Sequence, residues 1–237
     1  MTGDAASPRL LGRITGGLYL TIMVAAMFGE GFVRDKLVVS GDAAATAQNI
    51  VGSEALYRWS VVADITTTLC DVAVAALLYI LLRPVNRTGA VLAAFLRLAY
   101  SAAMALNAAF LMGPLLLLSN PPDLSGPDAP LIQFMVTYSL RLHTAGFQAA
   151  LVLFGAHLIV IGVLIAQSRL LPQAIGVALA IAGSCYIANS LVTFAAPGFA
   201  RLLFPWLLLP GFLAEGALTL WLLIASVNAS AWMRLKA

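Results

Sequence analysis

The chain has 237 residues, of which 62% are hydrophobic and 10% are charged, whereas soluble proteins contain about 45–50% apolar and about 25% charged residues. This composition excludes a soluble globular protein and predicts an integral membrane protein. The formal net charge of +3 does not indicate nucleic-acid binding, because the Arg and Lys residues stand at the ends of apolar segments and form no basic run.

Apolar stretches account for most of the chain. A helix that crosses a bilayer needs about 20 mainly apolar residues, and within lipid a helix satisfies its own backbone hydrogen bonds. The sequence therefore predicts an all-α, polytopic transmembrane helical bundle in which residues 1–237 form a single transmembrane domain. The spanning helices, about six, are expected at about 10–33, 55–82, 89–118, 131–167, 171–195 and 203–228.

The first apolar stretch has two possible interpretations. Arg9 and Arg13 precede it, and Val24-Ala25-Ala26 is compatible with a signal-peptide cleavage site. A retained helix explains the stretch equally well, since the apolar character continues through Phe28 and Phe32. The polar residues 34–54 follow, where Asp42 is expected to cap a short helix that starts at Ala43.

Turn signals divide the remaining segments. Pro84 predicts a tight turn within residues 83–88, and four prolines with two aspartates predict a stiff acidic loop at 119–130. Pro210 and Gly211 are expected to kink the last helix or to shift its start.

Arg and Lys residues predict the orientation, because they accumulate on the cytoplasmic side. Four lie on one side of the predicted bundle, whereas the other side has seven, namely Arg9, Arg13, Arg83, Arg87, Arg169, Arg234 and Lys236. We therefore expect both termini in the cytoplasm and a multi-pass location in the cell inner (plasma) membrane.

Charged residues within the spans need partners, since an ionised side chain in hydrocarbon costs at least ~2.5–3.5 kcal/mol. Asp71 stands 13 residues before Pro84 and Arg97 stands 13 after it, so a hairpin about this turn places both at the same depth. We expect an Asp71–Arg97 ion pair, with either a structural role or a role in ligand or proton handling.

Three further polar pairings are expected. Asp64 lies on the same helix face as Asp71, and Asn107 matches its depth, which predicts a hydrogen bond between Asp64 and Asn107. Glu30 and Arg34 have the spacing of an i,i+4 ion pair. Near the midplane of the last helix stands Glu215, which is expected to face one of four residues: His143, Arg97, Asn189 or Tyr186.

The histidines and cysteines do not predict a metal site. His143 and His157 would lie ~21 Å apart along one helix, too far to bind one ion, and zinc sites need about four ligands at ~2.0–2.3 Å. Cys70 and Cys185 lack motif spacing and are expected to be free apolar fillers. No metal and no cofactor are predicted.

The chain resembles a bacterial membrane family called domain of unknown function 4386. The resemblance covers nearly the whole chain and rests on Arg13–Gly16, Leu18-Tyr19, Phe32–Arg34, Gly41–Ala47, Ala63-Asp64, Cys70-Asp71, Leu82–Asn86, Arg97, His143, His157, Glu215 and Leu220–Leu222. It implies a polytopic integral membrane protein without an assigned activity. Asn189 stands where the family pattern leads us to expect an acidic residue.

Three functions compete. The first is binding or transport of a small molecule or ion by a polar core of Asp64, Asp71, Arg97, Asn107, His143 and Glu215. The second is a structural or accessory role, in which these charges fix the helix register. The third is an intramembrane hydrolase that uses His143 with Asp64 or Glu215, although no catalytic residue can be assigned. The expected partners are the lipid bilayer and a small-molecule or ion ligand, with no nucleic acid; the sequence does not predict an oligomeric state.

Overall fold

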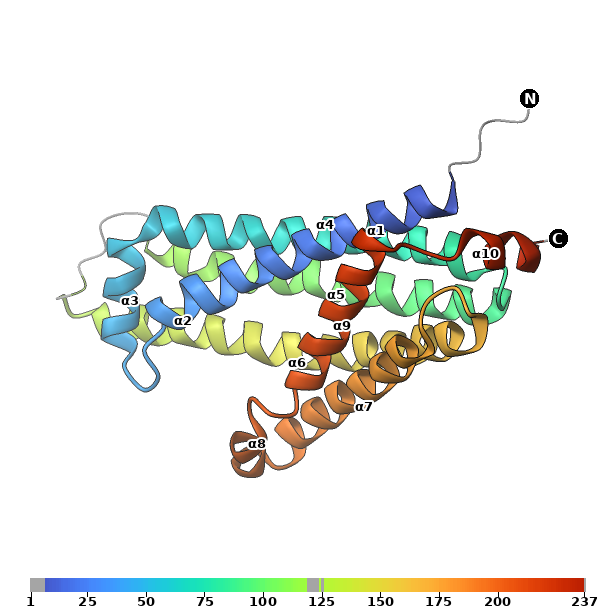
Figure 1. The fold of residues 1–237 in the computed structure, drawn as a ribbon. Coiled ribbons are helices and arrows are strands. Elements are labelled where there is room, and N and C mark those ends of the chain that lie inside the picture. Colours follow the sequence, from blue (N-terminus) through green and yellow to red (C-terminus); the bar gives the residue numbers. More distant parts are fainter. Residues whose placement is uncertain (1–6, 119–123, 125, 237) are drawn as a thin grey trace. The chain divides into compact units, whose positions relative to one another are not determined.

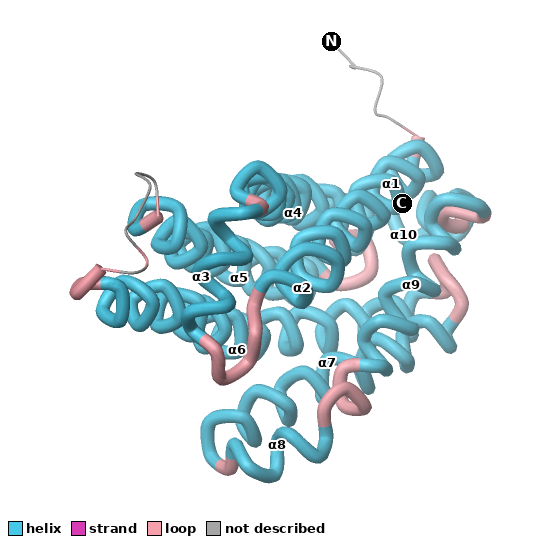
Figure 2. The backbone as a smooth tube through the Cα atoms, turned by 90° about the vertical axis from the view of Figure 1, so that its left-hand side faces the viewer, coloured by secondary structure: helices cyan, strands magenta, loops and turns pink. Residues whose placement is uncertain are grey.

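The computed structural model describes residues 7–118, 124 and 126–236, and these residues form helices joined by short loops, with no strand among them (Figure 2). The predicted all-α class is therefore confirmed. The elements are α1 (Pro8–Ala26), η1 (Met27–Arg34), α2 (Asp35–Leu37), α3 (Ala43–Gly52), α4 (Glu54–Leu82), α5 (Arg87–Leu117), α6 (Ala129–Ser168), α7 (Gln173–Ala195), α8 (Pro197–Leu203), α9 (Leu209–Ile224) and α10 (Ala229–Lys236), and Figure 1 labels all of them except η1, which connects α1 to α2.

Five helical segments of the described chain are long and apolar enough to cross a membrane: Pro8–Leu37, Glu54–Leu82, Arg87–Leu117, Ala129–Ser168 and Gln173–Ala195. A sixth candidate combines α9 and α10, which meet at a bend of 92°. The described residues thus contain five candidate spans, or six if this bent pair is one span, compared with about six expected from the sequence. Many apolar side chains on these helices are exposed, as lipid-facing side chains must be; the exposed fraction is 71% for Leu69 and 77% for Leu106.

The first span changes its helical pitch before it ends. Through Val24-Ala25-Ala26 the helix is continuous, and from Met27 to Arg34 it is a π-helix with wider turns. Beyond α2, Gly41 adopts a φ of 84°, which glycine accepts without strain. Asp42 then caps α3 as expected, and its Oδ1 accepts a hydrogen bond of 2.8 Å from the Ala45 N–H.

The last span differs most from its expected boundaries. Instead of one helix over about 203–228, the chain has α8, a turn, and then α9 from Leu209 to Ile224. Pro205 lacks the N–H that a continuing helix needs, while Pro210 lies in the first turn of α9, where proline is tolerated. The helix start is thus shifted, which was one of the two effects expected from Pro210-Gly211.

The contacts of the chain define two compact units. Among the described residues, the first unit comprises 7–20, 70–101 and 148–236, and the second comprises 21–69 and 102–147. The core of the second unit surrounds Tyr57, whose hydroxyl donates a 3.0 Å hydrogen bond to the Leu111 carbonyl. Its other buried members include Val33, Ile50, Val61, Val136 and Leu140.

In the first unit, α6 and α7 approach each other at glycines. A methyl group added to Gly162 would lie 2.5 Å from the Gly176 carbonyl oxygen, and one added to Gly155 would lie 2.6 Å from the Gly183 oxygen. Such pairs of small residues let two backbones pack closely in a membrane. The Gly12-x-x-x-Gly16 motif has a similar use, because a methyl group on Gly16 would lie 2.9 Å from the Leu223 nitrogen on α9.

Candidate functional site

The six polar residues predicted from the sequence belong to different units. Asp71, Arg97 and Glu215 lie in the first unit, whereas Asp64, Asn107 and His143 lie in the second. They therefore fall into two groups, one in each unit, and hydrogen bonds connect them only in part: Asp71 pairs with Arg97 and Asn107 with His143, while Asp64 and Glu215 bind other residues.

In the first unit the centre of the group is Arg97 on α5, whose side chain is fully buried. Its Nη2 donates to Asp71 on α4, and its Nη1 donates to the hydroxyl of Tyr19 on α1. The predicted Asp71–Arg97 ion pair is confirmed. The guanidinium also lies 4.6 Å from the ring centre of Tyr19 and 5.3 Å from that of Phe154, so two aromatic faces add cation–π attraction.

His157 completes this Arg97 network. Its Nδ1 lies 2.8 Å from the Ala93 carbonyl oxygen, so Nδ1 bears the hydrogen and donates it. Nε2 is then an acceptor for Arg97 Nη1 at 3.2 Å. Neither His157 nor Tyr19 was among the polar-core residues predicted from the sequence. The Arg97 guanidinium could have indicated that further partners were needed, since its five N–H donors exceed what one carboxylate accepts.

Glu215 on α9 accepts a hydrogen bond of 2.8 Å from the hydroxyl of Tyr186 on α7. Gly211, one turn earlier on α9, provides the room, because a side chain there would collide with the Tyr186 ring. Of the four residues expected to face Glu215, Tyr186 is therefore the one that binds it. Asn189, another of the four, instead donates to Gln148 on α6 at 3.0 Å.

In the second unit Arg34, at the end of η1, binds two carboxylates. Its Nε donates to Glu30 at 2.7 Å, while Nη1 and Nη2 donate to the two oxygens of Asp64 at 2.6 and 3.1 Å. The Glu30–Arg34 pair is confirmed, but the predicted Asp64–Asn107 hydrogen bond is wrong. A bidentate guanidinium is a stronger partner for a buried carboxylate than an amide, and Arg34 is only 6% exposed.

Asn107 on α5 pairs with His143 on α6 instead. The Asn107 amide nitrogen donates to the His143 carbonyl oxygen at 2.9 Å and lies 3.1 Å from the His143 ring nitrogen Nδ1. The amide occupies the space that Gly146 leaves free, since a side chain at Gly146 would overlap it. The amide oxygen of Asn107 is buried and has no hydrogen-bond partner among the described residues.

The second unit contains a cavity of about 350 Å³ that adjoins both the Arg34 contacts and the Asn107–His143 contacts. Arg34 and His143 line it together with Glu30, Asp35 and Arg141; the loop around Gly41 and the α6 residues Thr137 and Thr144 complete the wall. Of the predicted site residues, His143 lines the cavity directly. Asp64 contributes indirectly, because it binds Arg34, which lines the cavity. Arg141 is exposed and forms no ion pair with any described residue.

The described part of the chain contains no group of three or more His, Cys, Asp or Glu side chains that could hold a metal ion. Cys70 and Cys185 are both free.

Comparison with protein families gives one match. The model of the family described as Domain of unknown function (DUF4386) matches residues 14–225. The chain belongs to this family. The match contains both polar groups and the cavity, so they are parts of the DUF4386 region itself. No curated protein and no solved structure matches the chain. The protein is accordingly an integral membrane member of DUF4386, a family whose function is unknown.

Proposed function

We propose that this DUF4386 protein binds, or binds and transports, a small zwitterionic molecule in the cavity formed by η1, the loop 38–42 and α6, within the inner (plasma) membrane. The observation that supports it is the presence of opposite charges around one cavity: Arg141, which has no ion pair within the described part of the chain, and Glu30, whose Oε1 is not used for Arg34.

The charges favour a ligand that has both signs. Glu30 uses Oε2 for Arg34, and its side chain is 63% exposed, so Oε1 can accept a hydrogen bond from an ammonium group. Arg141 can bind a carboxylate through two parallel hydrogen bonds. The volume of about 350 Å³ lies near the lower end of the ~300–1,000 Å³ typical of ligand pockets, which suits a molecule of amino-acid size.

The walls of the cavity are held in place before any ligand arrives. Asp64 and Glu30 fix the Arg34 guanidinium from two sides, and Asn107 fixes His143. A preorganised site of this kind loses little entropy on binding. The π-helix that bears Glu30 and Arg34 is a rare backbone form, often found at functional sites.

The Arg97 network has a different proposed role, which is to hold helices together. Arg97 is completely enclosed, and Asp71, Tyr19 and His157 each direct a polar atom toward its guanidinium. Its charges compensate each other, as a structural or accessory function requires.

The test is a ligand screen on purified protein in a neutral detergent. Amino acids and other small zwitterions should raise the melting temperature more than amines or carboxylates of the same size. Arg141→Gln should weaken binding by about tenfold or more, because it removes a charge-assisted contact. Arg201→Gln, an exposed arginine on α8 outside the cavity, should leave binding unchanged. Equal losses in both variants, or no response to any zwitterion, would refute the proposal.

A further inference from the structure

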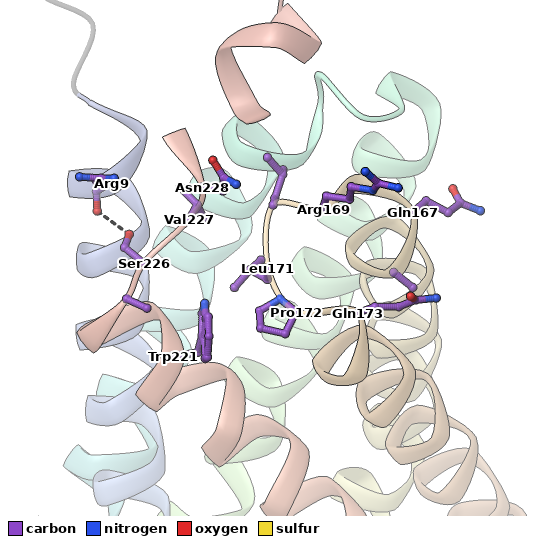
Figure 3. A pocket seen from close by; sticks show the side chains of 13 residues that line it. Arg9, Gln167, Arg169, Leu171, Pro172, Gln173, Trp221, Ser226, Val227 and Asn228 are labelled. Atoms are coloured by element: carbon purple, nitrogen blue, oxygen red, sulfur yellow. Dashed lines mark hydrogen bonds between the residues drawn. The ribbon is translucent and has the colours of Figure 1, made fainter. Parts of the chain in front are cut away.

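A second and larger cavity lies in the first unit, independent of the proposed zwitterion site. It has a volume of about 770 Å³ and is formed by the start of α1, the loop between α6 and α7, and the segment between α9 and α10. Figure 3 shows Arg9 on one side of it and Arg169 on the other, with Trp221 and Pro172 between them. None of the 13 lining residues is acidic.

The cavity is rich in hydrogen-bond donors for an anion. Arg9 and Arg169 are exposed and form no ion pair with any described residue. Gln167, Gln173 and Asn228, whose side chains carry neutral amide groups, also line the cavity. Two guanidinium groups that have no ion pair among the described residues, beside neutral amides and with no acidic residue in the lining, form an environment that attracts phosphate.

The loops around the cavity are tied to one another. Ser226 donates a 2.7 Å hydrogen bond to the Arg9 carbonyl oxygen (dashed in Figure 3), and the Asn228 N–H donates to the Leu170 carbonyl oxygen at 2.9 Å. Gly12 allows the Ser226 hydroxyl to lie against α1. These contacts fix the three segments that present the two arginines.

The backbone at Arg169 supports a specific use of its side chain. Arg169 follows the last residue of α6 with a φ of 54°, a left-handed conformation that glycine usually provides at a helix C-terminus. An arginine at this position accepts an unfavourable backbone conformation, which proteins retain mainly where the side chain or the site requires it.

We propose that this cavity binds a phosphate group, held between Arg9 and Arg169, from an anionic membrane phospholipid or from a soluble phosphate ester. Trp221 and the apolar side chains of Leu171 and Val227 give the site a lipid-compatible floor. The expected orientation of the chain places Arg9 and Arg169 on the cytoplasmic side, where basic pockets between helices bind anionic headgroups.

Native mass spectrometry of the detergent-purified full chain tests the proposal and separates the two sources. The probes are phosphatidylglycerol, phosphatidylcholine and glycerol phosphate. Phosphatidylglycerol should bind at least tenfold more tightly than phosphatidylcholine. Glycerol phosphate that binds and competes with phosphatidylglycerol would support the phosphate site and assign it to soluble esters as well; binding of phosphatidylglycerol alone would assign it to lipid.

Variants show whether the cavity is responsible. Arg9→Gln and Arg169→Gln should each weaken binding by about tenfold or more, and Ala225→Trp should block the cavity without a change of charge. Arg83→Gln is the matched control, since Arg83 is exposed and does not line the cavity. Circular dichroism and thermal melting without lipid identify a variant that fails to fold. The other two cavity variants then test whether the cavity binds the phosphate. The proposal is overturned if Arg83→Gln weakens binding as much as the cavity variants, or if no probe binds.

Discussion

Two buried arginines have different surroundings, although each lies in an apolar helix. Arg97 meets one carboxylate, a phenol, an imidazole and two aromatic faces. Arg34 meets two carboxylates and borders a cavity. Charge compensation is therefore complete around Arg97, whereas around Arg34 Glu30 retains an accessible carboxylate oxygen.

The Asp71–Arg97 pair should show strong energetic coupling. Arg97→Gln leaves a buried carboxylate without its cation and should lower the free energy of unfolding by about 3–5 kcal/mol. Asp71→Asn should be similarly harmful, and the double variant should lose much less than the sum of both. Equilibrium unfolding in detergent measures this cycle. Glu54→Gln is the control, since the Glu54–Arg58 pair is about half exposed and should contribute less than ~1 kcal/mol; additive losses at Asp71 and Arg97 would contradict the coupling.

The sequence predicts the carboxylate that binds Arg97 but only one of the two carboxylates that bind Arg34, because Asp64 was missed for a geometric reason. Asp71 and Arg97 flank a tight turn, so counting residues from the turn equates their depths. Between Arg34 and Asp64 stands α3, a helix of ten residues, and residue counting then says nothing about relative depth. The π-helix adds a second obstacle, because 3.6 residues per turn no longer describes which face Arg34 occupies.

Among the helices, the close approach of α6 and α7 depends on glycines spaced seven residues apart, Gly155 and Gly162 facing Gly183 and Gly176. The atoms nearest to these positions belong to the backbone, which cannot move aside as a flexible side chain can. Single-sequence inspection did not find this contact, since the partner of a glycine is known only once the two helices are placed side by side.

Gly162→Ala should separate α6 from α7 and destabilise the protein by about 1–3 kcal/mol. Gly17→Ala serves as the control, because a methyl group at Gly17 meets nothing within 4 Å and alanine is the better helix former by about 1 kcal/mol. Thermal unfolding in detergent compares them. Equal melting temperatures for both variants would mean that the glycines do not determine the helix contact.

Asp42 should control the local stability of α3. Asp42→Ala removes the hydrogen bond to the Ala45 N–H and should weaken the cap by about 0.5–2 kcal/mol. Hydrogen exchange should therefore accelerate at the first amides of α3 and stay unchanged in α4. Asp42→Asn, which keeps a cap acceptor, should restore most of the protection; uniform acceleration over both helices would indicate a global effect instead.

For the whole molecule, five candidate spans followed from hydropathy, because each is a long continuous apolar helix, whereas the sixth candidate is a pair of helices that meet at a bend of 92°. The shifted start of α9 was one of the effects expected from Pro210-Gly211, whereas the end of α8 was not predicted, because the apolar run extends across it and the helix ends at the extended backbone of Phe204, before Pro205.

The orientation expected from the distribution of Arg and Lys residues predicts which loops a reagent outside the cell can reach. In a variant with Cys70 and Cys185 changed to alanine, Ser40→Cys should react with a membrane-impermeant maleimide in intact cells, whereas Thr88→Cys should react only after the cells are opened. Both positions are exposed, so access is determined by the side of the membrane. The opposite labelling pattern would reverse the expected topology.

The π-helix η1 also affects how the gene tolerates changes in length. A deletion inside an α-helix rotates all later residues by about 100°, which would turn the polar residues of α4 or α6 away from their partners. A π-turn contains an extra residue compared with an α-turn. A single-codon deletion near Gly31 therefore lets the segment form an ordinary α-helix, and the helices before and after it keep the same faces toward their neighbours. Viable in-frame deletions in the first span should therefore concentrate at Met27–Arg34.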